Sequence, residues 1–196
     1  MSDKFEFTPE NMVIAQQCIA KYPEGRQASA VLPLLDLAQR QNNNYASDAV
    51  IDTVAELLGM ARIRVVEVAS FYTMINTKPV GKYLLQICTT TPCWLRNSDE
   101  VVEAARSHLG IDYEQTTEDG LFTMREVECL GACVNAPIVQ INDDMFEDLN
   151  GSQLIAVLDA LKAGEKPPHG PQIERQKSAP VGGPHTLNDL DFAEAD

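Results

Sequence analysis

Four of the five cysteines in this 196-residue chain form two close pairs. Cys88 and Cys93 have the spacing C-x4-C, and Cys129 and Cys133 have the spacing C-x3-C after an interval of 35 residues. Cysteine thiolates are soft ligands that suit iron and zinc. Each pair follows a short apolar segment with β character, so each is expected where a strand ends. Two such ends, adjacent in one sheet, would bring the four thiols together.

The residues between the cysteines suit an iron–sulfur cluster. A [2Fe–2S] cluster is held by four cysteine thiolates, and the C-x4-C spacing is also used by plant-type ferredoxins. Thr89, Thr90 and Thr91 can offer hydroxyl and N–H donors to sulfur, and Gly131 lets the second loop curl closely. We therefore predict one [2Fe–2S] cluster, a carrier of single electrons, with four ligands: Cys88, Cys93, Cys129 and Cys133.

Other uses of clustered cysteines remain open at this point. Structural zinc also takes four cysteines, although it favours two-residue spacers within each pair. Disulfides would require an oxidising compartment, which nothing in the sequence indicates. A thioredoxin-type redox pair needs C-x-x-C, which the sequence lacks. Cys18 lies apart from both pairs in a helical pattern with apolar neighbours, so we predict a buried core residue.

The first part of the chain, residues 1–76, is predicted to be a small helical bundle. Thr8 followed by Pro9 is a typical helix start, Ser47 can cap a later helix, and Gly59 can end it. Residues 62–72 fit either a strand or a short helix, and the helical neighbours favour a helix.

Residues 77–163 are predicted to form a second domain of α/β class. A break at 77–81 precedes the order strand, helix, strand, strand, strand, helix, which gives a mixed sheet with helices packed on it. Ser98 is expected to cap the first helix. Residues 164–196 are rich in proline, glycine and polar groups, and we expect an extended tail that orders only on a partner. The strands are expected at 83–87, 121–127, 138–142 and 145–147, and the helices at 98–109 and 152–162.

Composition and motifs exclude several classes of function. The net charge is −14, from 29 acidic and 15 basic residues, so nucleic acid is a poor partner. We find no apolar run of ~18 residues and no signal pattern at the N-terminus, so we expect a cytosolic or already processed chain without direct membrane insertion. Neither the G-x-G-x-x-G nor the P-loop pattern is present, so we expect nicotinamide and flavin to be bound by another chain.

Three further positions are candidates for roles near the cysteines or at a partner. Glu126 and Glu128 flank the second pair, and we hypothesise that their charge makes a cluster harder to reduce; the alternative is that they face solvent on a strand. Trp94 follows Cys93 and either shields a cluster or packs the start of the next helix. Phe71 and Tyr72 either face a partner or pack between the domains.

These motifs together resemble one family. The sequence is similar to the NuoE-type thioredoxin-like [2Fe–2S] subunit of respiratory complex I, the proton-translocating NADH:quinone oxidoreductase. The resemblance covers roughly residues 10–165 without a departure at any ligand position. It rests on CTTTPC at 88–93, ECLGAC at 128–133, NAP at 135–137 and EVASFYTM at 67–74.

The resemblance implies a thioredoxin-like fold for the second domain and a place in a larger complex. The partners would be a flavoprotein that binds FMN and NADH and other subunits of the peripheral arm. The cluster would exchange single electrons with that FMN, off the main chain of clusters. The subunit would be peripheral, on the cytoplasmic side of a bacterial inner membrane or the matrix side in mitochondria.

Two other functions also fit these motifs. The first is the equivalent subunit of a soluble NAD-linked hydrogenase or formate dehydrogenase. The second is a stand-alone thioredoxin-like ferredoxin, a carrier or a redox sensor. The helical first domain argues against the second alternative, because a free carrier would need only the domain that holds the cysteines.

Overall fold

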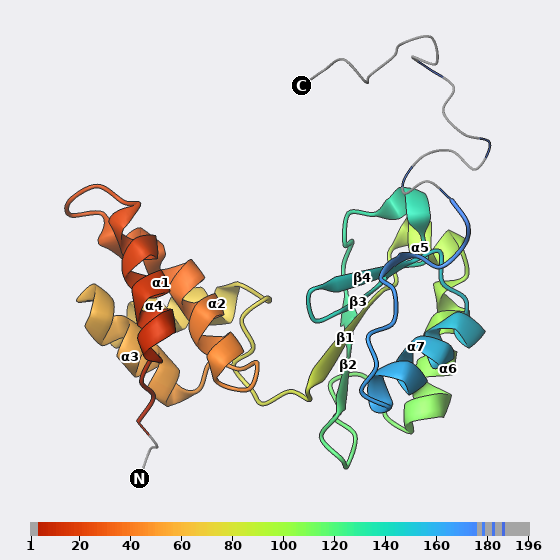
Figure 1. The fold of residues 1–196 in the computed structure, drawn as a ribbon, viewed down its shortest axis with the longest axis horizontal. Coiled ribbons are helices and arrows are strands. Elements are labelled where there is room, and N and C mark those ends of the chain that lie inside the picture. Colours follow the sequence, from red (N-terminus) through yellow and green to blue (C-terminus); the bar gives the residue numbers. More distant parts are fainter. Residues whose placement is uncertain (1–3, 176–177, 179–181, 183–185, 187–196) are drawn as a thin grey trace. The chain divides into compact units, whose positions relative to one another are not determined.

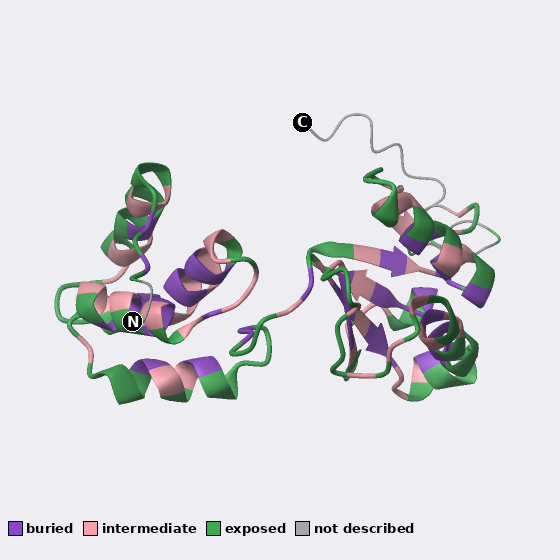
Figure 2. Cartoon of the chain, turned by 90° about the horizontal axis from the view of Figure 1, so that it is seen from below, coloured by how far each residue is buried: buried purple, intermediate pink, exposed green. Residues whose placement is uncertain are grey.

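A computed structural model describes residues 4–175, 178, 182 and 186 of the chain (Figure 1). The chain divides into two compact units, Met1–Lys82 and Tyr83–Asp196. Each unit has its own apolar core, and the buried positions concentrate on the facing sides of the elements within each unit (Figure 2).

The first unit is helical, as the sequence predicts. Thr8 caps the first helix by accepting a hydrogen bond from the Asn11 N–H at 3.2 Å. Ser47 caps the third helix in the same way, and Gly59 ends it at φ +60°, a left-handed conformation that glycine adopts without strain. The ambiguous segment is a helix. The elements are α1 (Pro9–Ala20), the 3-10 helix η1 (Gln27–Ala30), α2 (Val31–Gln41), α3 (Asp48–Leu58) and α4 (Arg62–Phe71).

The core of the helical unit is built from one apolar face of each helix. Burial of such faces supplies most of the stability of short helices. Cys18 lies on α1 and packs against this core, but it is half-buried rather than fully buried as predicted. The fully buried positions include Ala15, Leu34, Leu35, Val50, Val54 and Val65.

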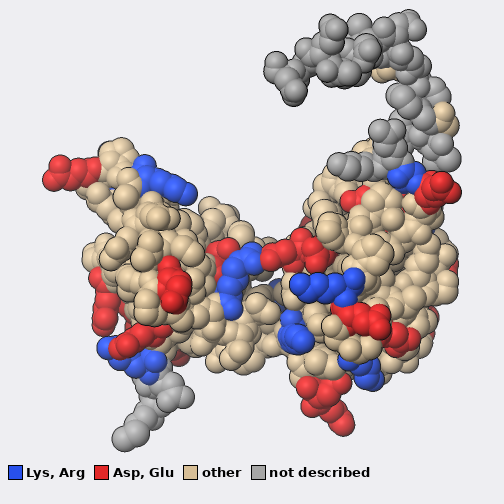
Figure 3. Space-filling model, viewed as in Figure 1, with Lys and Arg blue, Asp and Glu red and all other residues tan. Residues whose placement is uncertain are grey.

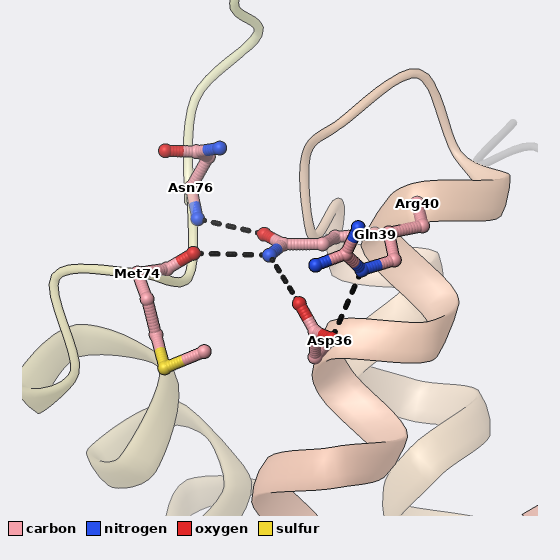
Figure 4. Close-up of polar contacts among 5 residues, drawn as sticks. All are labelled: Asp36, Gln39, Arg40, Met74 and Asn76. Carbon is pink, nitrogen blue, oxygen red and sulfur yellow. Dashed lines mark hydrogen bonds and ion pairs between the residues drawn. The ribbon is translucent and has the colours of Figure 1, made fainter. Parts of the chain in front are cut away.

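A buried glutamine holds the segment that leaves the helical unit (Figure 4). The Gln39 side chain donates to the Met74 carbonyl at 3.0 Å and accepts from the Asn76 N–H at 3.0 Å. Gln39 also donates to Asp36 at 3.2 Å, and Asp36 pairs with Arg40 at 3.0 Å. Gln39 thereby satisfies two backbone groups of a segment that has no regular secondary structure.

The second unit is built around a five-stranded mixed sheet. Its strand order is β2-β1-β3-β4-β5. β1 is parallel to β2 and antiparallel to β3, β3 is antiparallel to β4, and β4 is parallel to β5. The strands are β1 (Tyr83–Cys88), β2 (Phe122–Val127), β3 (Val139–Ile141), β4 (Asp144–Glu147) and β5 (Gly170–Pro171). The predicted mixed α/β sheet is confirmed.

Two long helices, α6 (Ser98–Leu109) and α7 (Gly151–Lys162), lie side by side on one side of this sheet (Figure 1). They approach closely at Gly151, where an added Cβ would lie 3.0 Å from the Ala104 Cβ. The predicted cap of α6 is wrong, because Asn97 occupies the capping position and Ser98 is a buried residue of the helix. Asn150 and Gln153 form a capping box at the start of α7.

The first part of the predicted tail is ordered within the second unit. Residues 170–171 form β5, and the Gln172 N–H donates to the Glu147 carbonyl at 2.9 Å. Arg175 pairs with Asp148, and both side chains are buried. Our expectation that this stretch orders only on a partner is therefore wrong for residues 170–175. β5 pairs with the edge of β4 that β3 does not occupy, and Arg175 pairs with the buried carboxylate of Asp148. The remainder of the tail lies largely outside the described residues.

Charge is dispersed over the visible surface. On the face drawn in Figure 3, acidic and basic side chains are interspersed among the described residues. Within the described ranges, no helix has the length and apolar character needed to cross a membrane.

Candidate functional site: two cysteine pairs at one end of the sheet

The parallel pairing of β1 and β2 brings the two cysteine pairs together. Cys88, the last residue of β1, lies opposite Val127, the last residue of β2. Cys129 follows two residues later. The carboxyl ends of parallel neighbours meet at the same edge of a sheet, so segments 39 residues apart at Cys88 and Val127 converge. The prediction that the two strand ends are adjacent is confirmed.

The first pair is buried. Cys88 and Cys93 are each 1% exposed and pack with Ala136 and Ile138 in a small apolar cluster. The sequence predicts a loop between these two cysteines. The prediction is wrong for the second half of this stretch, because Thr91–Leu95 form the short helix α5. Pro92 favours that first helical turn, since its fixed φ is already helical. Cys93 therefore sits on a helix rather than in a loop.

The second pair lies at the surface. Cys129 and Cys133 are exposed, and their Sγ atoms are 3.3 Å apart. Gly131 adopts φ +85°, which lets the loop curl back so that its N–H donates to Cys129 Sγ at 3.4 Å. The 3-10 helix η2 (Cys133–Asn135) follows, and the next peptide bond, Ala136–Pro137, is cis.

The second loop packs against the first pair. Leu130 and Ala132, on either side of Gly131, contact the apolar cluster that contains Cys88 and Cys93. Within the described ranges, the structure brings no three His, Cys, Asp or Glu side chains close enough to hold a single metal ion. The thiols are thus arranged as two pairs.

The surroundings affect the thiols unequally. Burial raises the pKa of the Cys93 thiol to about 12. Burial also acts to raise the pKa of Cys88, but hydrogen bonds from Thr90, Cys93 and the Leu130 N–H outweigh it and lower that pKa overall. The hydrogen bond with Cys129 raises the pKa of Cys133. Among Cys88, Cys93 and Cys133, Cys88 is the thiol whose surroundings favour the anion.

Two threonine hydroxyls in the first loop have different partners. Thr90 Oγ1 lies 3.3 Å from Cys88 Sγ. The Thr89 hydroxyl instead donates to the Glu126 carboxylate on β2 at 2.5 Å. The sequence predicts threonine donors to sulfur, but it does not identify Glu126 as the competing acceptor. Only the parallel register of β1 and β2 reveals that contact.

Exposed apolar side chains lie on the two short helices that carry Cys93 and Cys133. Trp94 and Leu95 on α5 are 58% and 70% exposed, and Val134 on η2 is 68% exposed. α5 contacts η2, so these side chains belong to one area, the α5–η2 face. Trp94 therefore does not pack the start of α6 as a core residue. In the helical unit, Phe71 and Tyr72 are also exposed and touch each other edge to face.

Buried polar contacts hold the second cysteine loop against the end of β4. Asn135, directly after Cys133 and Val134, is buried and donates through its side chain to Glu147. The Asp148 N–H donates back to the Asn135 carbonyl at 2.7 Å. Asp148 is the partner of Arg175, so the ordered tail supports the same loop.

Comparison with known proteins identifies the family. The family model described as "Thioredoxin-like [2Fe-2S] ferredoxin" matches residues 15–162. The chain is 49% identical over 183 residues to NADH dehydrogenase [ubiquinone] flavoprotein 2, mitochondrial, of Dictyostelium discoideum, covering 93% of this chain and 74% of that protein. It is 52% identical over 158 residues to a subunit of the NADH-quinone oxidoreductase of Rickettsia conorii, covering 81% of this chain and 95% of that one.

A solved structure gives the same fold. The crystal structure of an NAD+-reducing [NiFe]-hydrogenase in the H2-reduced state matches with a TM-score of 0.59 at 17% identity. The match covers 68% of this chain and 23% of that chain.

The fold and the paired cysteines define a protein of the [2Fe–2S] ferredoxin class on a thioredoxin-like sheet. The chain belongs to the thioredoxin-like [2Fe–2S] ferredoxin family. The resemblance inferred from CTTTPC and ECLGAC is thereby confirmed at the level of the family.

Proposed function

We propose that this chain is the electron-transfer subunit of an NADH:quinone oxidoreductase, with one [2Fe–2S] cluster held by Cys88, Cys93, Cys129 and Cys133. The observation that carries the proposal is the convergence of two thiol pairs at the ends of β1 and β2. When bound, such a cluster accepts and returns one electron at a time. About half of the residues are identical to those of proteins that are named as parts of this oxidoreductase.

The donor set fits a binuclear cluster. Four soft thiolates, arranged as two pairs, match the need for two sulfur ligands on each iron. Cys88 and Cys93 would hold it from the buried side, and Cys129 and Cys133 from the surface side. The Gly131 N–H donates to Cys129 Sγ and would help to stabilise the negative charge of the site.

We further propose that the α5–η2 face is where a flavoprotein with FMN and NADH docks. Its exposed apolar side chains lie on the helices that carry Cys93 and Cys133, so a partner seated there would shorten the path for an electron. This arrangement would leave nicotinamide and flavin on the partner. The chain would then be a peripheral subunit on the side of the membrane where NADH is oxidised, the cytoplasmic side in bacteria or the matrix side in mitochondria.

Domain roles follow the same proposal. Residues 77–163 would carry the cluster, residues 1–76 would add a helical interaction domain, and the tail from 164 would extend from the cluster domain. The high identity to complex I subunits favours this function over the hydrogenase alternative, for which the likeness of 17% identity supports the fold alone. A free carrier would not need the helical domain.

The ligand assignment is tested by loading the full chain with iron and sulfide and recording the electron paramagnetic resonance (EPR) spectrum after dithionite reduction. We expect two irons and two sulfides per chain and a rhombic signal. Replacing any one of Cys88, Cys93, Cys129 or Cys133 by serine should weaken or alter the signal. Cys18→Ser is the matched control and should leave it unchanged, because Cys18 lies in the helical unit. Zinc without sulfide in the wild-type chain would overturn the proposal.

The partner is tested by affinity purification of the tagged full chain from its native host. We expect a complex that contains FMN and oxidises NADH with a quinone acceptor. Trp94→Glu combined with Leu95→Glu should release the chain from that complex while retaining the cluster. A soluble hydrogenase or formate dehydrogenase, or a monomer, would contradict the proposal.

A further inference from the structure

We propose that Thr90 is a positioning residue that makes the cluster easier to reduce by donating its hydroxyl hydrogen bond to Cys88 Sγ. This inference rests on the proposed function, because it requires Cys88 to bind iron. It concerns a residue that is not itself a ligand.

The contact is short and lies in a protected place. Thr90 Oγ1 is 3.3 Å from Cys88 Sγ, within the range of hydrogen bonds to sulfur. Cys88 is 1% exposed and Thr90 is half-buried. Hydrogen bonds in such low-dielectric surroundings are stronger than those in water.

The chemistry of a ligand thiolate fixes the direction of this hydrogen bond. In the free thiol, either the hydroxyl or the S–H group could be the donor. A thiolate bound to iron has no hydrogen, so the Thr90 hydroxyl must donate. A bond to a negatively charged acceptor is also stronger than one between neutral groups.

The Thr90 hydroxyl does not cap the helix that follows it, although a threonine at this position commonly does. It occupies the N-cap position of α5, with φ −69° and ψ 168°, where a hydroxyl ordinarily accepts from a helical N–H. Within the described part of the chain, no such side-chain cap is formed at α5. The hydroxyl faces Cys88 instead.

The neighbouring threonines serve as internal comparisons. Thr89 directs its hydroxyl to Glu126, and Thr91 is exposed at the first position of α5. Of the three adjacent hydroxyls, that of Thr90 is the one placed on a sulfur.

The hydrogen bond favours the reduced state. Reduction adds one electron from the donor and no atom to the site, so the ligand sulfurs become more negative. A donor to Cys88 Sγ is therefore held more strongly after reduction than before it. Removing the donor should make reduction less favourable, and the midpoint potential should fall.

The experiment compares three variants of the full chain: Thr90→Val, Thr90→Ser and Thr91→Val. Valine keeps the shape of threonine without the hydroxyl, whereas serine keeps the hydroxyl. Iron and sulfide are counted first, and the midpoint potential is then measured by a mediated dithionite titration followed by EPR. We expect the equilibrium constant for reduction to fall by about threefold to tenfold in Thr90→Val, where tenfold is about 59 mV for a one-electron couple. Thr90→Ser and Thr91→Val should remain at the wild-type value.

Each outcome decides the proposal. An unchanged midpoint in a fully loaded Thr90→Val chain would overturn it, and so would an equal shift in Thr91→Val. If Thr90→Val fails to hold a cluster while Thr90→Ser holds one, the hydroxyl serves assembly and the tuning role is wrong. A wild-type chain without iron and sulfide would instead refute the proposed function.

Discussion

Arg175 and Asp148 form a buried ion pair between the start of the tail and the end of β4. Arg175 Nη1 lies 3.0 and 3.2 Å from the two carboxylate oxygens, and the side chains are only 7% and 5% exposed. A buried ion pair adds little net folding stability compared with apolar side chains of similar volume. Removing one partner, however, leaves an uncompensated buried charge. Arg175 therefore contributes to the stability of the region that holds the second cysteine loop.

We expect Arg175→Ala to destabilise the chain by about 3–5 kcal/mol, the range for removing one partner of a buried ion pair. Urea unfolding, followed by circular dichroism, measures the change. Arg64→Ala is the matched control, because Arg64 pairs with Glu67 in an exposed position and should lose much less stability than Arg175→Ala. Equal losses in the two variants would show that Arg175 contributes no more than a surface pair.

Glu126→Gln should raise the midpoint potential of the proposed cluster by an amount on the order of tens of millivolts, because it removes a negative charge near a site that becomes more negative on reduction. Glutamine retains an oxygen that can accept from Thr89, so the contact at 2.5 Å in the wild type need not be lost. Glu128→Gln tests whether the charge of the second acidic residue also makes the cluster harder to reduce.

The control for charge alone is Glu165→Gln, beyond the end of α7, which should leave the midpoint unchanged. The effect of Glu126→Gln should also shrink at high salt, since exposed charges are screened. A wild-type midpoint in both Glu126→Gln and Glu128→Gln would end the electrostatic hypothesis in favour of two solvent-facing strand residues.

Gln39→Leu should destabilise the helical unit by about 1–3 kcal/mol, because the Asn76 N–H and the Met74 carbonyl lose a buried partner. Hydrogen exchange at the Asn76 amide should accelerate as that segment opens. Gln17→Leu on the exposed side of α1 is the comparison and should change neither quantity. Unaltered exchange at Asn76 in Gln39→Leu would mean that the glutamine does not hold the segment.

Gly151→Ala should weaken the contact of α6 with α7. Its Cβ would lie 3.0 Å from the Ala104 Cβ and 3.2 Å from Glu100 Oε1. Overpacking costs about 1–3 kcal/mol, and replacing glycine by alanine in a helix returns roughly 0.5–1 kcal/mol, so we expect a net loss of about 1 kcal/mol. Thermal unfolding measures it.

A double-mutant cycle with Ala104→Gly isolates this contact. Removing the opposing methyl group gives the new Cβ room, so Gly151→Ala should cost less in the Ala104→Gly background than in the wild type. Additive losses would show that the two helices adjust without strain at Gly151.

The sequence by itself determined most of the helices and strands and limited the chemistry of the site. Capping residues such as Thr8 and Ser47 placed helix starts because their oxygens satisfy N–H groups within three residues. The cysteine spacing limited the site to a few thiolate chemistries, and CTTTPC with ECLGAC indicated the family. These are local patterns, and local hydrogen bonding and hydrophobic periodicity are sufficient to encode them.

Only the tertiary structure decided which groups meet. The parallel register of β1 and β2 places the Thr89 hydroxyl on the Glu126 carboxylate. The helix that carries Cys93 and the pairing of Arg175 with Asp148 were likewise not predicted. These contacts join residues up to 37 positions apart (126 against 89), and strand register and side-chain packing fix them rather than any local preference.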